Sequence, residues 1–338
     1  MLKKILVNSA LLIGSLSLFF FGIEFGLRLT GLQTVQPNPP QVYQKNDNPV
    51  ISYTLKPNIN EHAFRSTVTT DENGFRINTQ KIEEDTREKP TIAVIGDSIT
   101  FGYGVENNET LPARLEERMP NFHFINTGVP GYLLSQEVAL YNAITRKMDP
   151  EAVMLVFFWN DLDGFEPGKV DDLGILRSHD WQSTDQQCVP ITEGILRYLP
   201  GKCWLDTHSA FYKAFKKLTN MVSGNKALEK TREQATQGEI EDPVDMQNVQ
   251  TYIQQLTAFT ETLPVKHYFV IWPDRYVHTQ SRTELIRAAE KLEYIVIDLT
   301  DIFGNSAPTL GWDTVHPHPD TIQKAADYIE NIMRSKTL

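Results

Sequence analysis

The residues best suited to chemistry in this 338-residue chain are a serine and a histidine that lie far apart in the sequence. Ser98 follows a short apolar run directly, where a buried strand is expected to end. His316 comes three residues after Asp313, a spacing that lets one turn hold both side chains on the same side. A hydroxyl, an imidazole that accepts its proton and a carboxylate that orients the imidazole are the groups that nucleophilic catalysis needs. Each segment alone is equally typical of a helix cap or a charged surface turn.

Two further segments could bind the negative charge that such a reaction develops. The loop from Asn126 to Gly131 contains two glycines, which permit a backbone N–H to come close to a bound oxygen. Asn160 follows another apolar run and carries a side-chain amide that can donate to an oxyanion. Alone, each of these is ordinary turn chemistry. Together with the serine and the histidine they supply every role in acyl transfer through a tetrahedral intermediate.

The elements expected to position these residues are strands of a parallel sheet. Five short runs are apolar without alternation and rich in β-branched or aromatic residues, which is typical of strands covered on both faces. They are Ile92 to Ile95, Phe122 to Ile125, Ala152 to Phe158, Tyr268 to Trp272 and Tyr294 to Leu299. The nucleophile, the glycine loop and the amide each follow one of the first three, at the edge where open sheets bind ligands.

Helical patterns alternate with these strands and predict an α/β sandwich. Thr110 and Ser135 are suited to cap two of the helices, and Asp242 with Pro243 is typical of the start of a third. Two more helices are expected at 281–292 and 321–333.

A long insertion, residues 162–241, separates the third and fourth predicted strands. Its place at the carboxyl end of a strand favours a lid or a substrate wall for 164–220, and the polar tract 224–241 is typical of a solvated segment. The insertion holds the only two cysteines, Cys188 and Cys203. Outside a membrane they could pair and close a loop of about fifteen residues, worth roughly 3 kcal/mol in the chain-entropy view. Two cysteines without matching histidines do not make a zinc site.

The four chemical segments, in this order, resemble the four blocks of the SGNH/GDSL hydrolase family. The matching residues are Gly96-Asp97-Ser98, the glycine loop that ends at Gly131, Asn160-Asp161 and Asp313-x-x-His316. The likeness covers about Lys89 to Met333 and is interrupted by the insertion. The family implies a flavodoxin-like three-layer α/β/α sandwich, here with five parallel strands, and esterase, lipase or acyltransferase chemistry without a metal or another cofactor.

Residue by residue, the resemblance implies a role for each position. Ser98 would be the nucleophile, His316 the general base and Asp313 the group that orients His316. The backbone N–H groups of Ser98 and Gly131, together with the Asn160 amide, would form the oxyanion hole.

The sequence departs from the family's pattern at two positions. Phe158 stands where the family has glycine, two residues before the asparagine, and this could narrow the crevice or tilt the amide. His318 follows the predicted base and is interpreted as a solvent-facing neighbour. Within the glycine loop, Gly131 fits the family's spacing from Asn126 better than Gly128 does.

The N-terminus predicts a membrane helix. Ile5 to Ile23 is a nearly unbroken apolar run whose nineteen residues would span roughly 28 Å, close to the hydrocarbon thickness of a bilayer. Lys3 and Lys4 precede it and favour a cytoplasmic N-terminus, with the rest of the chain on the outer side. A cleaved signal peptide would have small residues at a processing site, whereas this run continues into Glu24 without an A-x-A pattern. An uncleaved anchor is therefore favoured.

The order of these segments predicts three parts: an anchor at 1–32, a linker with a small β element at 33–88, and the hydrolase domain at 89–338. The net charge is −11, from 43 acidic against 32 basic residues. Such a chain is a poor nucleic-acid binder and is not expected to adhere broadly to anionic lipid. The expected partners are an ester substrate, whether a small molecule, a lipid or a glycan ester, and the membrane through the N-terminal helix.

Three functions remain open from the sequence. A serine esterase outside the cytoplasmic membrane is favoured. An O-acyltransferase that modifies an envelope polysaccharide would use the same residues with another acceptor. A non-catalytic glycan- or lipid-binding envelope protein would keep the crevice alone, and Phe158 is the one feature that favours it.

Overall fold

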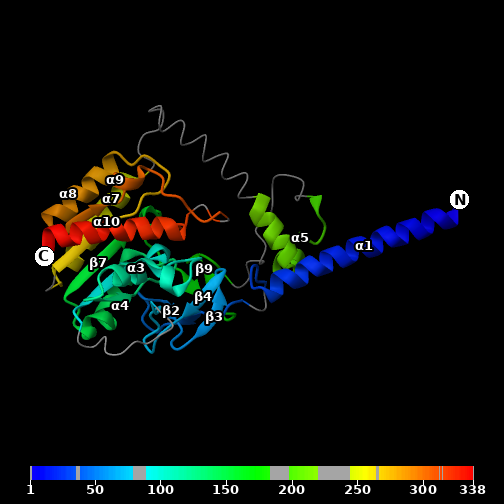
Figure 1. Cartoon of the computed structure of the whole chain (residues 1–338), viewed down its shortest axis with the longest axis horizontal. Helices are drawn as coiled ribbons and strands as arrows, with labels where there is room; N and C mark the ends of the chain where they lie inside the picture. Colours follow the sequence, from blue (N-terminus) through cyan, green and yellow to red (C-terminus); the bar gives the residue numbers. More distant parts are fainter. Residues whose placement is uncertain are drawn as a thin grey trace. The chain divides into compact units, whose positions relative to one another are not determined.

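The computed structural model describes residues 2–35, 39–78, 89–182, 198–219, 244–263, 266–311, 313 and 315–337. The chain divides into two compact units (Figure 1). Unit 1 comprises 1–40 and 180–222, and unit 2 comprises 41–179 and 223–338. The insertion predicted at 162–241 is therefore shared between the two units.

Unit 2 is built on a five-stranded parallel sheet. Its strands are β5 (Thr91–Gly96), β6 (His123–Asn126), β7 (Ala152–Phe157), β10 (Lys266–Ile271) and β11 (Ile295–Asp298). They lie in the order β11-β10-β7-β5-β6, and every adjacent pair is parallel. This is the flavodoxin-like order. The predicted fold class and its five strands are confirmed.

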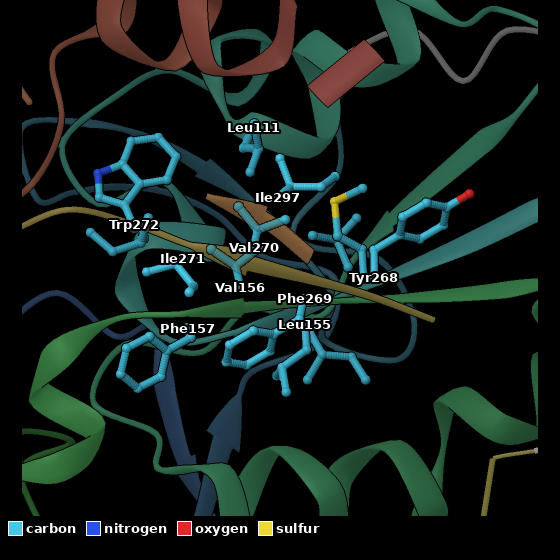
Figure 2. Packing of buried hydrophobic residues seen from close by; sticks show 14 of the residues in the cluster. Leu111, Leu155, Val156, Phe157, Tyr268, Phe269, Val270, Ile271, Trp272 and Ile297 are labelled. Carbon is cyan, nitrogen blue, oxygen red and sulfur yellow. The ribbon is translucent and has the colours of Figure 1, made fainter. Parts of the chain in front are cut away.

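Helices cover both faces of the sheet. On one face α3 (Leu111–Arg118) packs against α10 (Pro319–Thr337). On the other, α7 (Met246–Thr260) contacts both α4 (Leu134–Ala143) and α8 (Gln280–Lys291). Figure 2 shows helices on either side of the strands, with apolar side chains such as Leu111 and Phe157 filling the space between. Every residue of β7 is buried, which explains why its sequence is apolar without alternation.

The helix starts follow the predictions in part. Thr110 caps α3 by accepting from the N–H of Ala113, as predicted. Ser135 does not cap α4, because the helix already begins at Leu134. The third helix begins at Met246 with Asp245 as its cap, and Asp242 and Pro243 lie outside the described residues.

The segment before the sheet forms two antiparallel pairs. β1 (Tyr43–Lys45) pairs with β2 (Tyr53–Leu55), and β3 (Asn60–Ala63) pairs with β4 (Ser66–Thr69). Their apolar side chains form a second core with Phe101 and neighbouring residues from the edge of the sheet. The β1–β2 and β3–β4 pairs thus share a core with Phe101 of the helix that begins at Ser98 and with Ile125 of the edge strand β6.

Arg76 ties this segment to the sheet. Its backbone bridges to Asn126 at the end of β6, and its guanidinium is buried. The side chain donates five hydrogen bonds of 2.6–3.0 Å to Asn107 and to four backbone carbonyls. Two of those carbonyls belong to Phe101 and Gly102, at the end of the helix that begins with Ser98.

The insertion contributes to both units. In unit 2 it forms the hairpin β8 (Lys169–Val170) and β9 (Leu176–Arg177). In unit 1 it forms α5 (Lys202–His208) and a helix at 210–219, grouped with α1 (Leu2–Leu29). The tract 224–241 and Cys188 lie outside the described residues, so the pairing of Cys188 with Cys203 stays a prediction.

Candidate active site

The candidate nucleophile sits where the order of the sheet changes direction. Ser98 is the first residue of α2 (Ser98–Phe101), directly after β5. Asp97 caps this helix by accepting from the N–H of Ile99 at 2.8 Å. Ser98 is 7% exposed, and the neighbouring strand β7 ends just before Asn160. The carboxyl ends of β5 and β7 flank the topological switch point of a flavodoxin-like sheet, where sheets of this order bind ligands.

A hydrogen-bonded chain links the serine to the predicted base and acid. His316 Nε2 lies 3.0 Å from Ser98 Oγ, and His316 Nδ1 lies 3.0 Å from Asp313 Oδ2. Asp313 Oδ1 also accepts from the N–H groups of Val315 (2.7 Å) and His316 (3.0 Å). The structure thus brings Ser98 together with Asp313 and His316, which lie more than two hundred positions later in the sequence.

The carboxyl group of Asp313 is held ionised. Burial acts to raise its pKa, but the hydrogen bond and charge of His316 and the two backbone donors outweigh burial and keep the pKa well below its usual range. A carboxylate in this state can orient the imidazole and stabilise its protonated form.

An aromatic stack supports the histidine from the side. The ring of Tyr103 stacks on that of His316 with centroids 4.2 Å apart, and Phe64 lies 4.5 Å from Tyr103 in turn. Phe64 is at the tip of the β3–β4 hairpin, where it and Arg65 have positive φ. Burial and the charge of Asp313 raise the pKa of Tyr103 to about 12, so its hydroxyl keeps its proton near neutral pH.

The two glycines of the β6 loop are placed differently. A side chain on Gly128 would overlap the backbone of Phe101, so this glycine lets the loop pack against α2. Gly131 has φ +78° and lies beside the Tyr53 hydroxyl and Leu176 of the β8–β9 hairpin. Within the described part of the chain, the N–H groups of Ser98 and Gly131 donate no hydrogen bond to the protein.

Asn160 is held by the residue next to the nucleophile. Its Nδ2 donates to Asp97 Oδ2 at 2.9 Å, and Ser98 Oγ lies 3.2 Å from the same oxygen. One carboxylate therefore connects the ends of β5 and β7. Phe158 belongs to the core cluster of the sheet and is 6% exposed.

Two more carboxyl groups are buried close to Asp97. Glu137, on α4, is 2% exposed, and neither of its oxygens has a hydrogen-bond partner among the described residues. Burial first, and the negative charge of Asp97 second, raise the pKa of Glu137 far above its usual value. Burial and the charges of Glu137 and Asp97 do the same for Asp161. Both groups therefore ionise less readily than an exposed carboxyl group.

Sequence reasoning missed Tyr103 and Glu137. Tyr103 lies five residues after the nucleophile, and a tyrosine among Phe101, Gly102 and Gly104 gives no signal of contact with a histidine two hundred residues away. Glu137 lies within the predicted helix after the glycine loop. An acid between apolar residues on a core-facing helix is unusual, and this feature of the sequence indicates a buried carboxyl group. His318 is half exposed and lies near Asp320, in keeping with its interpretation as a solvent-facing neighbour.

The described residues contain no group of three or more His, Cys, Asp or Glu side chains arranged to hold a metal ion.

The charges of two arginines act on Asp313 from separate elements. Arg65 is at the hairpin tip, and Arg275 follows β10.

Comparisons with known proteins find similarity at the level of solved structures. No family model and no curated protein matches the chain. One similar structure is a member of the lipolytic protein G-D-S-L family from Veillonella parvula, with 14% identity, a TM-score of 0.40, and coverage of 72% of this chain and 98% of that one. Another is the lipase/acylhydrolase from Enterococcus faecalis, with 12% identity, a TM-score of 0.42 and coverage of 73% and 97%. The esterase EstA from Pseudoalteromonas sp. has 13% identity, a TM-score of 0.40 and coverage of 73% and 98%.

Proposed function

We propose that this protein is a serine hydrolase of carboxylic esters, of the SGNH/GDSL kind, held at a membrane by α1. The observation that supports this best is the chain of contacts from Ser98 through His316 to Asp313, with two links of 3.0 Å. The position of Ser98 at the carboxyl end of β5, the edge where sheets of this order bind ligands, also supports the proposal.

In the proposed reaction, Ser98 Oγ attacks the carbonyl carbon of an acyl or acetyl ester. His316 Nε2 takes the proton of the hydroxyl, and Asp313 stabilises the imidazolium that forms. The carbonyl oxygen becomes an oxyanion, which accepts from the N–H groups of Ser98 and Gly131 and from the Asn160 amide. Collapse of the intermediate expels the alcohol, which takes the proton from His316. Water then attacks the acyl-serine by the same route and releases the acid.

Asp97 acts in this scheme as a positioning residue. Its Oδ2 accepts from Asn160, and this fixes the amide at the edge of the crevice while one N–H of the Nδ2 group is left for the substrate. The same oxygen is an alternative acceptor for the Ser98 hydroxyl at 3.2 Å, slightly farther than His316.

The membrane half of the proposal concerns α1. Among the described residues, one helix, Lys3–Leu29, is long and apolar enough to cross a bilayer, a test that signal sequences also pass. Glu24 of this helix accepts three hydrogen bonds from the insertion, which supports an anchor that is retained in the folded protein. The lysines at its start support a cytoplasmic N-terminus and a catalytic unit on the outer side.

The experiment that tests the catalytic half uses the full chain in detergent with a fluorophosphonate probe and a panel of esters that vary in acyl length and alcohol. We expect the probe to label wild type, and Ser98→Ala to lose both labelling and turnover. Ser135→Ala, which removes a serine on α4 and keeps Ser98, is the control for labelling. Turnover by Ser98→Ala equal to that of wild type would refute the assignment. Acyl transfer from the same donors only when a glycan is supplied would identify the O-acyltransferase instead.

A further inference from the structure

One carboxylate joins the N-terminal helix to the insertion in unit 1. Glu24 accepts hydrogen bonds from the Ser209 hydroxyl (2.9 Å) and from the backbone N–H groups of Ala210 (2.9 Å) and Phe211 (2.8 Å). These N–H groups begin the helix at 210–219, whose first turn would otherwise leave them unpaired. Glu24 therefore caps a helix nearly two hundred residues away, and its negative charge matches the positive end of that helix.

Two further contacts fix the same junction. Arg28 forms an ion pair with Glu24 at 2.6 Å and donates to the carbonyl of His208, the last residue of α5. One turn earlier on α1, the ring of Phe20 meets that of Phe211 edge to face, with centroids 5.2 Å apart. Phe20 belongs to the apolar run, so the insertion contacts α1 within its hydrophobic length and at its polar end.

The length of α1 sets the depth of this junction. If the apolar run Ile5 to Ile23 fills the hydrocarbon core, Glu24 lies at its boundary, and the headgroup layer beyond is roughly 5–8 Å thick. Trp204 and Phe215 are each one helical turn from the residues that Glu24 and Arg28 hold, which is about 6 Å along a helix. Whichever way the two helices run, these side chains stay within the headgroup layer or reach the acyl chains.

Their exposure and surroundings fit that environment. Trp204 is 62%, Phe215 40% and Leu218 53% exposed, although all three are large and apolar. Phe215 and Leu218 continue the stripe that begins at Phe211, at spacings of four and three. Tryptophan is enriched at membrane interfaces, where its ring is partly solvated.

The charge of this segment is opposite to that of the whole chain. Residues 198–219 contain four lysines against one aspartate, whereas the chain carries −11. Lysines flanking an apolar stripe are typical of helices that lie in the membrane surface, where they face lipid phosphates. The composition of the whole chain hid this local feature.

We propose that α5 and the helix at 210–219 lie in the headgroup layer of the bilayer that α1 crosses, with Trp204, Phe215 and Leu218 directed toward the acyl chains. Unit 1 is then a membrane module with one spanning helix and two surface helices that Glu24 and Arg28 hold at its end. This inference rests on the membrane half of the proposed function. It assigns the second part of the insertion to lipid, where the sequence favoured a lid or a substrate wall.

The test uses the full chain reconstituted in vesicles of phosphatidylcholine with a minor share of phosphatidylglycerol. Flotation after alkaline extraction first reports whether the anchor is inserted. Vesicles are then prepared with phosphatidylcholine brominated either near the headgroup end or near the middle of the acyl chains, since bromine quenches tryptophan at short range. Subtracting the emission of Trp204→Phe from that of wild type isolates Trp204. Trp272→Phe, at a fully buried position in unit 2, is the matched control for the subtraction.

We expect the Trp204 component to be quenched more strongly by bromine near the headgroups than by bromine at mid-chain, and the Trp272 component by neither. Glu24→Gln, which weakens the cap, should reduce the quenching of Trp204 in protein that still floats. A floating protein whose Trp204 emission is unaffected by both lipids would overturn the inference and leave the anchor intact. Loss of protein from the vesicles on extraction would overturn both the anchor and this inference. The catalytic half of the proposed function would stand, because esterase activity does not depend on this result.

Discussion

The buried Glu137 should make the protein's stability depend on pH in a way that one substitution removes. Its side chain is 2% exposed without a hydrogen-bond partner among the described residues, and burial with the charge of Asp97 raises its pKa. In the unfolded chain the same carboxyl ionises near pH 4.3. Between that pH and the raised pKa of the folded state, unfolding therefore releases a proton.

The sign and size follow from proton linkage. Below about pH 4.3 both states hold the proton and the folded state bears no penalty from this group. Above it, each pH unit lowers the free energy of unfolding by about 1.4 kcal/mol until the folded pKa is reached. Even one pH unit of such a loss is a large part of a typical net stability.

Glu137→Gln keeps the size and polarity of the side chain but cannot ionise. We expect the stability advantage of the variant over wild type to grow as the pH rises above about 4.3, by about 1.4 kcal/mol per pH unit until the folded pKa of Glu137 is reached. The measurement is urea unfolding of the full chain in detergent at several pH values from 5 to 8, followed by tryptophan fluorescence. Glu290→Gln, on the exposed side of α8, is the matched control, and its difference from wild type should stay constant.

A difference between Glu137→Gln and wild type that stays flat or shrinks as pH rises would refute the reasoning, because it would mean that Glu137 is charged in the folded protein. Burial first, and then the charges of Glu137 and Asp97, raise the pKa of Asp161 as well. Asp161→Asn should therefore show the same trend.

Three further outcomes are expected. Asn160→Ala should lower kcat by about a hundredfold to a thousandfold with little change in KM, measured on the best ester of the panel, because an oxyanion donor acts mainly in the transition state. Tyr103→Phe should retain near wild-type turnover and Tyr103→Ala should lose it in part, because stacking on His316 requires the ring and not the hydroxyl; equal kcat for the two variants would contradict this. Arg76→Lys should lower the free energy of unfolding by about 3 kcal/mol or more in urea titrations, since an ammonium cannot replace all five donors to buried acceptors.

The sequence predicts the positions of residues that are covalently next to strand ends. Ser98, Asn126 and Asn160 each lie within three residues of the end of an apolar run, and parallel strands bring their carboxyl ends to one edge of the sheet. The apolar run marks where each strand ends, and the parallel pairing of β5 with β7 sets the two ends side by side. This is why the fold and the approximate site could be predicted without any knowledge of side-chain packing.

Residues that reach the site through packing could not be predicted in this way. Phe64 arrives on a hairpin whose tip requires positive φ at two residues that are not glycine, and no sequence rule foretells this. The insertion appeared as one segment because nothing in its composition marks the boundary near His179, where it passes from one unit to the other. Its attachment to α1 depends on Glu24, which as a sequence feature only marked the end of an apolar run.

Asp97 illustrates why an acid stands between the glycine and the serine of the first block. The carboxylate of Asp97 makes three contacts. One oxygen caps α2 by accepting from the N–H of Ile99, and the other lies within hydrogen-bond distance of both Ser98 Oγ and Asn160 Nδ2. A side chain with a single acceptor atom could not hold the helix start and the amide from β7 at once. The nucleophile and one oxyanion donor are thereby fixed to each other across the switch point, although they belong to different strands. The pairing of a reactive serine with a buried carboxylate is thus a requirement of assembling the site from two strand ends.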